Sequence, residues 1–103
     1  MFRFLFAAAA VSALASPALA QDAEVGKEYN ITIATEESNQ YVGAYGQVKI
    51  GEVLVMVPDA KVSERYTVKI TAVGTNQYTG NKQASCEFKQ IGGDREGMCL
   101  GAP

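Results

Sequence analysis

The chain has 103 residues, of which 48% are hydrophobic, and a net charge of −2, so it is long enough for one small domain. Its excess of acidic residues argues against a general nucleic-acid binder, whose affinity depends on neutralising phosphate groups. It contains no histidine, which removes the side chain most often used for acid–base catalysis and for metal binding.

Residues 1–20 have the pattern of a bacterial secretory signal peptide. Arg3 supplies the positive charge, Phe4 to Ala15 form an apolar run, and Ala18-Leu19-Ala20 provides the small residues of a cleavage site. The competing interpretation is a transmembrane anchor, which needs roughly 20 apolar residues, and this run is shorter. We expect a signal helix that is cleaved after Ala20, and a product in the periplasm or outside the cell. The remaining 83 residues carry eight basic and eleven acidic side chains, a net charge of −3.

The first predicted strand covers residues 26–34, where apolar and polar side chains alternate. Tyr29, Ile31 and Ile33 fall on one face of this strand, as in a half-buried strand. The polar, acidic segment 34–40 that follows predicts a loop.

The second predicted strand, residues 41–50, is interrupted by glycines. Its later half places Val48 and Ile50 on the inward face. Gly43 and Gly46 indicate bulges or sharp coiling, which a small barrel needs at its corners.

A tight turn at Gly51-Glu52 leads to the third predicted strand, residues 53–57. Its continuous apolar run, VLVMV, predicts burial on both faces. Pro58 ends the strand because proline cannot donate to a ladder. The fourth strand, residues 65–73, alternates again, and its predicted inward side chains are Tyr66, Val68, Ile70 and Ala72.

The last predicted strand, residues 82–89, follows a turn-rich loop and places Ala84, Cys86 and Phe88 on one face. Residues 91–103 are rich in glycine and predict an irregular tail. Cys86 and Cys99 are the only cysteines, and in an oxidising compartment they are expected to form a disulfide that ties this tail to the barrel. A redox pair or a metal site is the alternative, but the chain has neither a CxxC spacing nor histidine.

Five short strands, with no helical period after residue 20, predict an all-β fold. A small, closed or partly open OB-like barrel over residues 21–90 removes the sheet edges that would invite aggregation. A five-stranded sandwich is the alternative.

The order of these segments resembles the TRAM domain, a small RNA-binding β-barrel. The resemblance covers residues 24–84 and includes the first strand VGKEYNITI, Gly46 in the second strand and the Val57-Pro58 pair. It also includes these matching residues: Val48-Lys49-Ile50, Ala60, Glu64, Arg65 and Val68-Lys69-Ile70-Thr71.

The chain departs from the family at positions that matter for function. Asp59 and Ser63 stand where the family usually has glycines, and the glycine of the second turn is displaced to Gly51. After Thr71 the family carries a basic run, whereas this chain has AVGTNQYTGN and no positive charge until Lys82. The resemblance implies the barrel scaffold and nucleic acid as the ancestral ligand, with much of the phosphate-binding surface lost.

The candidate binding residues combine cations that face outward with aromatic rings. Tyr45 and Tyr78 would add rings from loops to a stacking-plus-phosphate surface. The competing interpretation is a set of solvated charges and partly buried rings, because acidic residues lie in the neighbouring loops. The complete set of candidates is Lys49, Arg65, Lys69, Tyr45, Tyr78 and Lys82.

No motif for catalysis, cofactor binding or metal ligation is present in the sequence. We expect an exported, non-catalytic binding module of TRAM-like fold. The resemblance implies single-stranded RNA or DNA as its ligand, whereas the acidic charge and the predicted compartment favour an envelope protein or a glycan. A purely structural envelope protein is the third hypothesis.

Overall fold

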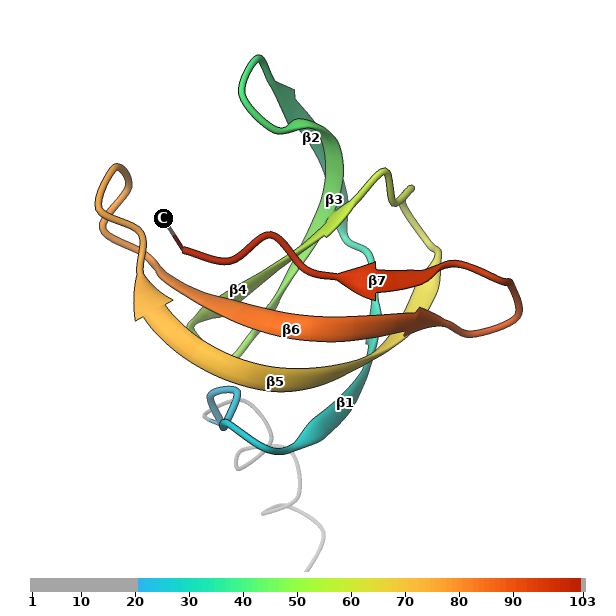
Figure 1. Ribbon diagram of the computed structural model, residues 1–103, viewed down its shortest axis with the longest axis horizontal. Coiled ribbons are helices and arrows are strands. Elements are labelled where there is room, and N and C mark those ends of the chain that lie inside the picture. The colour runs from blue at the N-terminus through green and yellow to red at the C-terminus, as the bar shows by residue number, and fades with distance from the viewer. Residues whose placement is uncertain (1–20, 103) are drawn as a thin grey trace, which may run out of the picture.

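The computed structural model describes residues 21–102, so the predicted signal peptide and its cleavage site lie outside the described residues. Residues 21–102 form seven strands and no helix. This part of the chain therefore has no helix that is long and apolar enough to cross a membrane. The prediction of an all-β, barrel-like fold is confirmed (Figure 1). The strands are β1 (Glu28–Thr32), β2 (Thr35–Asn39), β3 (Gly43–Ile50), β4 (Val53–Pro58), β5 (Arg65–Thr75), β6 (Lys82–Gln90) and β7 (Glu96–Met98).

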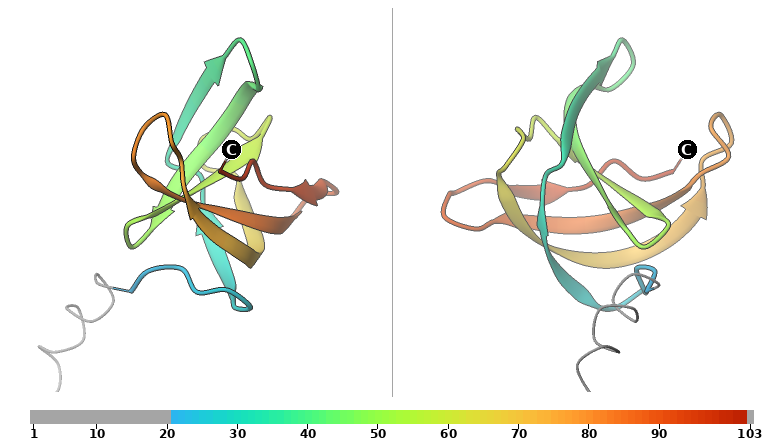
Figure 2. Two further views of the ribbon diagram at one scale, coloured as in Figure 1. Left: turned by 60° about the vertical axis from the view of Figure 1, so that its left-hand side comes forward. Right: turned by 180° about the vertical axis from the view of Figure 1, so that it is seen from behind.

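All strands belong to one strongly curled sheet of order β1-β5-β6-β4-β3-β2, and β7 pairs with β6. Its two end strands, β1 and β2, are consecutive in the chain and separated by only Ile33 and Ala34. Residues 28–39 therefore form one continuous ribbon, the β1–β2 ribbon. Its first half, β1, pairs with β5, and its second half, β2, pairs with β3. Figure 2 shows β1 running on into β2 across the back of the molecule. The β4–β6 pair is parallel and the other pairs are antiparallel.

The core is the interior of this curled sheet, and its residues follow the predicted alternation. Tyr66, Val68 and Ile70 of β5 are buried, as are Ala84, Cys86 and Phe88 of β6. The Tyr66 and Phe88 rings pack edge to face with their centroids 5.5 Å apart. The run VLVMV of β4 is buried except for the partly exposed Leu54.

Two strands lie where the sequence predicted irregular chain. Residues 35–39, predicted as a loop, form β2, and the tail predicted to be irregular contains β7. Every residue of both strands is exposed, so neither has the apolar alternation that marks a half-buried strand. Glu36 fixes β2 to the β4–β5 loop by accepting the Val62 N–H at 2.9 Å and pairing with Lys61 at 3.9 Å.

Ala72 is exposed rather than inward-facing, because the β5–β6 register shifts between Ile70 and Ala72. An extra residue at a bulge reverses which side chains face the core. Of the two alternatives predicted for the glycines of β3, bulges or sharp coiling, the bulges are absent, since β3 keeps one register with both β2 and β4.

Gly46 instead allows β3 to approach the bend of the β1–β2 ribbon. A Cβ atom at this buried position would lie 2.6 Å from Ile33 Cγ2 and 2.9 Å from Ala60 Cβ. Nothing larger than hydrogen fits without displacing core atoms.

Asp59 and Ser63, in the turn between β4 and β5, have φ values of 57° and 76°. This left-handed region favours glycine. Neither position is a glycine, so this turn has a backbone shape that suits glycine while carrying other residues.

The predicted Cys86–Cys99 disulfide is present, and a disulfide fits an oxidising compartment. It holds the segment after β7 between β6 and β4. Cys99 N–H donates to Cys86 O at 2.8 Å, and Leu100 N–H donates to Met56 O at 2.9 Å. The segment thus fills the gap left because β4 and β6 pair only at Val53 and Leu54.

Removing the disulfide with Cys86→Ala/Cys99→Ala is expected to lower the free energy of unfolding by about 3 kcal/mol, because the unfolded chain regains the entropy of a loop of roughly 14 residues. Urea denaturation of the variant and of the oxidised parent measures this difference. The parent after reduction by a thiol is the control and should match the variant. A loss below about 1 kcal/mol would mean that the tail is held without the bond.

Gly46→Ala is expected to destabilise the barrel by about 1–3 kcal/mol through overpacking against Ile33 and Ala60. Gly74→Ala is the matched control on β5, where the new Cβ would meet only Ala102 at 3.5 Å. Thermal or urea unfolding compares the two variants. Equal stability of both would show that the close approach at Gly46 is not a constraint.

Candidate ligand-binding groove

The four cations predicted for ligand binding lie on different parts of the barrel. Lys49 of β3 lines a depression next to β1, whereas Lys69 of β5 lines another depression with β1, β6 and β7. Arg65 is exposed at the start of β5. Lys82, at the start of β6, forms an ion pair of 3.7 Å with Asp22. The four side chains therefore do not converge on one phosphate-binding surface.

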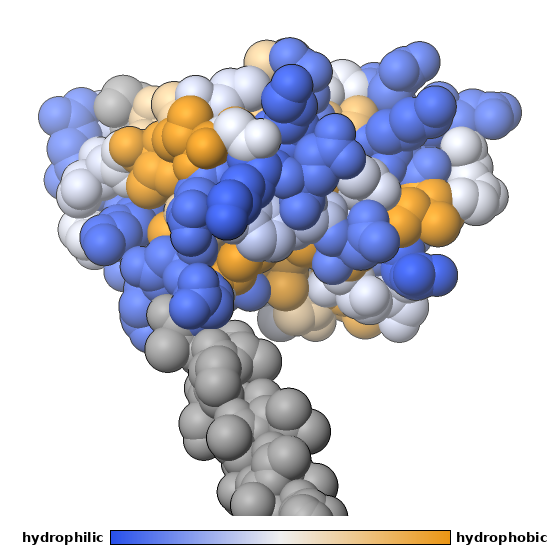
Figure 3. Space-filling view, turned by 90° about the horizontal axis from the view of Figure 1, so that it is seen from below, coloured by the Kyte–Doolittle hydropathy of each residue, from blue (hydrophilic) through white to orange (hydrophobic). Residues whose placement is uncertain are grey.

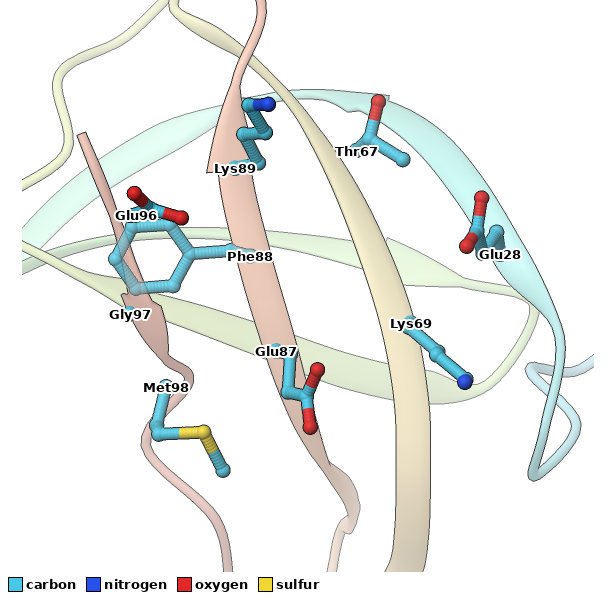
Figure 4. A pocket seen from close by; sticks show the side chains of 9 residues that line it. All are labelled: Glu28, Thr67, Lys69, Glu87, Phe88, Lys89, Glu96, Gly97 and Met98. Atoms are coloured by element: carbon cyan, nitrogen blue, oxygen red, sulfur yellow. The ribbon is translucent and has the colours of Figure 1, made fainter. Parts of the chain in front are cut away.

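The depression around Lys69 is a shallow part of the outer sheet face with mixed charges (Figure 4). Lys69 lies between Glu28 of β1 and Glu87 of β6, which are its partners in register. Hydrophilic side chains separate small hydrophobic patches on the face seen from below in Figure 3. Such a surface is typical of sheet faces in water, and the flanking carboxylates weaken any attraction of Lys69 for an anion.

The two predicted tyrosines differ in their positions. Tyr45 is partly buried within β3, opposite Glu37 and Pro58, and is not in a loop as predicted. Tyr78 lies in the β5–β6 loop and is 80% exposed. A third tyrosine, Tyr41, was not among the predicted site residues and is 87% exposed in the β2–β3 loop.

Tyr41 and Tyr78 occupy the same place in two loops of matching sequence, NQYVG at residues 39–43 and NQYTG at residues 76–80. This repeat was the signal in the sequence that could have identified Tyr41. The two loops extend from the same side of the barrel, and the C-terminal end of the chain lies between them (Figures 1 and 2).

The β2–β3 loop is shaped by its asparagine. Asn39 Oδ1 accepts the N–H groups of Tyr41 at 2.8 Å and Val42 at 2.9 Å. Gly43 then takes a φ of 82° and starts β3. An asparagine that binds the backbone two residues ahead defines the turn locally, so Tyr41 is presented by its own loop.

The β5–β6 loop uses the same contacts. Asn76 Oδ1 accepts the N–H groups of Tyr78 at 2.9 Å and Thr79 at 3.2 Å. Gly80 takes a φ of 80°, and its N–H donates to Asn76 O at 2.7 Å. The repeated sequence therefore produces a repeated turn, and each turn exposes one tyrosine ring.

The two loops border one groove of about 800 Å³, within the usual range of roughly 300–1,000 Å³ for ligand sites. Its lining is formed by Tyr41, Val42, Met56, Asn76, Tyr78, Gln83, Leu100 and Gly101. Over residues 21–102, every side chain that lines the groove is uncharged.

The groove floor is a hydrogen-bonded link between the β5–β6 loop and the C-terminal segment. Gln83 is only 3% exposed, and its Oε1 accepts the Asn76 Nδ2–H at 3.0 Å. Gln83 Nε2 donates to Leu100 O at 2.7 Å. Because the disulfide at Cys99 fixes Leu100, the bond that ties the C-terminal segment to β6 also positions this part of the groove lining.

A second polar cluster, at the start of β5, is structural. Buried Tyr66 donates its O–H to Glu64 Oε1 at 2.8 Å and accepts an N–H from Arg95 at 2.8 Å. Arg95 also donates to Pro58 O at 2.5 Å and lies 5.5 Å from the centroid of the Phe88 ring. These contacts satisfy the tyrosine hydroxyl in the core, and none of these residues lines the groove between Tyr41 and Tyr78. Within the described part of the chain, no group of three or more His, Cys, Asp or Glu side chains is arranged to hold a metal ion.

The pKa of Glu64 lies below its ordinary value of 4.5. The largest cause is the hydrogen bond from the Lys61 N–H, followed by the hydrogen bond from Tyr66. Because the unfolded chain binds a proton more readily, this carboxylate stabilises the fold above its ordinary pKa. The contribution is lost as the pH falls through the lowered, folded-state pKa.

Glu64→Gln is expected to reduce stability at pH 7 and to make stability fall less steeply as the pH is lowered from about 6 to about 3. Urea midpoints measured across this range test the expectation. Glu37→Gln, which changes an exposed carboxylate of β2, is the control. If the Glu64 variant keeps the parent's pH dependence, the cluster does not couple to protonation of this residue.

No protein-family model, curated protein or solved structure matches the chain. The groove between Tyr41 and Tyr78 is therefore identified as the candidate site from the positions of its lining residues alone.

Proposed function

We propose that this chain is an exported, non-catalytic binding module of TRAM-like barrel fold that holds an extended ligand in the groove between Tyr41 and Tyr78. The observation that carries the proposal is the pair of matching turns at residues 39–43 and 76–80. Two turns of one design expose one ring each at the borders of a single groove. Exposed aromatic side chains beside a groove are a common feature of binding surfaces.

The position of the groove within the fold supports the same function. OB-type barrels bind oligonucleotides and oligosaccharides on the face of their second and third strands, between the first–second and fourth–fifth loops. If the β1–β2 ribbon counts as the first strand, the β2–β3 and β5–β6 loops are those two loops. The groove is lined by residues of both loops and by Met56 of β4, the third strand.

Export is supported by two independent features. The predicted signal peptide over residues 1–20 directs the chain out of the cytoplasm, and the Cys86–Cys99 disulfide suits an oxidising compartment. The periplasm or the extracellular medium is therefore the proposed location. Envelope components are the ligands available there.

Binding of single-stranded nucleic acid is the second candidate function. The TRAM resemblance implies it, and the glycine-like φ values of Asp59 and Ser63 support the resemblance in the turn before β5. Exposed tyrosines also provide stacking platforms for bases. Against this candidate, the cations lie apart from the groove and Lys82 is paired with Asp22.

The proposal predicts that a ligand perturbs the two loops together. In ¹H–¹⁵N spectra, a cognate component of a periplasmic envelope extract should shift the backbone signals of residues 40–42 and 76–79. Tyr41→Ala and Tyr78→Ala should each remove most of the effect, whereas Val62→Ala, an exposed change on the β4–β5 loop, should leave it unchanged. Because both tyrosine side chains are largely exposed, their loss should leave the fold intact, as circular dichroism will show.

A structural protein without a ligand would leave these signals unmoved in every extract fraction. Titration with a short single-stranded RNA at low salt distinguishes nucleic-acid binding from binding of an envelope component. If RNA shifts the same signals and the shift weakens as salt rises, the groove is a nucleic-acid site.

A further inference from the structure

We infer that the groove takes a linear, uncharged oligosaccharide, an inference that rests on the proposed binding function and names its ligand class. Three features of the groove carry it. They are the neutral lining, the two exposed tyrosine rings and the hydrogen-bonded amide pair of partly exposed Asn76 and buried Gln83.

The charge of the groove disfavours polyanions as ligands. A nucleic acid carries one negative charge per phosphate, and its binding sites neutralise several of them with lysine or arginine. In the part of the chain that the structure describes, no lysine or arginine lines the groove, and Lys82 is paired with Asp22 at 3.7 Å. The net charge of −3 for residues 21–103 repels polyanions further. A neutral polymer needs no cations in the groove and is not repelled by the net negative charge of the domain.

The tyrosines match the flat faces of pyranose rings. The face of an aromatic ring is electron-rich and attracts the partly positive C–H groups of a saturated ring. Tyrosine also supplies a large contact area at a low cost in side-chain entropy, since it has only two χ angles. With one ring on each bordering loop, a linear chain of sugars can contact both Tyr41 and Tyr78 while lying along the groove.

The amides supply the polar contacts that hydroxyl groups need. The nitrogens of Asn76 and Gln83 each carry two N–H groups. One N–H of Asn76 binds Gln83 Oε1, and one N–H of Gln83 binds Leu100 O. For the other N–H of each amide no partner is found among residues 21–102, so we infer that it can donate to a ligand oxygen. Because Gln83 is almost wholly buried, its remaining N–H gains most from an acceptor that enters the groove.

A proline-rich peptide is the main competing occupant, because such peptides also dock on aromatic grooves. Both sugar hydroxyls and proline carbonyls can accept the amide N–H groups, so the hydrogen bonds of the groove do not separate these two occupants. The predicted location in the cell envelope favours the sugar.

The test is titration of the ¹⁵N-labelled protein with cellohexaose, the β-1,4-linked hexamer of N-acetylglucosamine and maltohexaose. Tyrosine fluorescence provides a parallel signal because the chain contains no tryptophan. At least one hexaose should shift the signals of Tyr41 and Tyr78 saturably. Its affinity should change less than about twofold between low and high salt, since no counterions are released.

Variants separate ring stacking from hydroxyl chemistry. Tyr41→Ala and Tyr78→Ala should each weaken binding of that hexaose by about tenfold or more, as expected for loss of an aromatic stacking partner. Tyr41→Phe and Tyr78→Phe, which keep the ring, should retain most of the affinity. Val62→Ala again serves as the control outside the groove.

Decauridylate and decaproline, titrated in the same way, decide between the outcomes. If either shifts the loop signals while every hexaose leaves them unmoved, the groove is a binding site but the oligosaccharide assignment is wrong. If a hexaose shifts only signals outside the two loops, the assignment is also wrong. If neither these oligomers nor the envelope extract shifts the loops, both the oligosaccharide assignment and the proposed function fail.

Discussion

The bend at Ile33 and Ala34, between β1 and β2, is the constraint on which the rest of the structure depends. Ile33 N–H donates to Glu64 O, Ser63 N–H donates to Ile33 O, and Ala34 N–H donates to Gln47 O. These bonds hold the ribbon where it leaves β5 and joins β3. The β1–β2 ribbon pairs with β5 on one side and with β3 on the other. The strands between them, β6 and β4, must therefore curl around one interior. The side chain of Ile33, packed over Gly46, fills the inside of the bend.

The same closure creates the groove, although no groove residue takes part in the bend. Curling brings the β2–β3 and β5–β6 hairpins to one side of the barrel, where Tyr41 and Tyr78 border a common space. The disulfide at Cys99 then places Leu100 against β4 and Gln83, which completes the floor. Scaffold stability and groove geometry are therefore linked through the C-terminal segment, so a change that releases this segment is expected to affect both.

The surface on the groove side combines exposed aromatic rings with neutral surroundings. The segment that follows Thr71 is an uncharged loop that presents Tyr78. Among residues 21–102, no lysine or arginine lines the groove. A ligand that stacks but carries no phosphate suits such a surface.

The sequence by itself determined the features that depend on local pattern. Alternation placed Tyr66, Val68 and Ile70 in the core, and two cysteines left a single disulfide pairing. The sequence did not predict β2, because a fully exposed strand has no alternation of buried and exposed residues. It also did not predict the exposure of Ala72, because the bulge that causes it depends on the pairing of β5 with β6. The repeat NQYxG was visible in the sequence, but Tyr41 and Tyr78 share a groove only because the sheet curls. Local pattern fixes which side of a strand a residue occupies, whereas long-range pairing alone decides which distant residues meet.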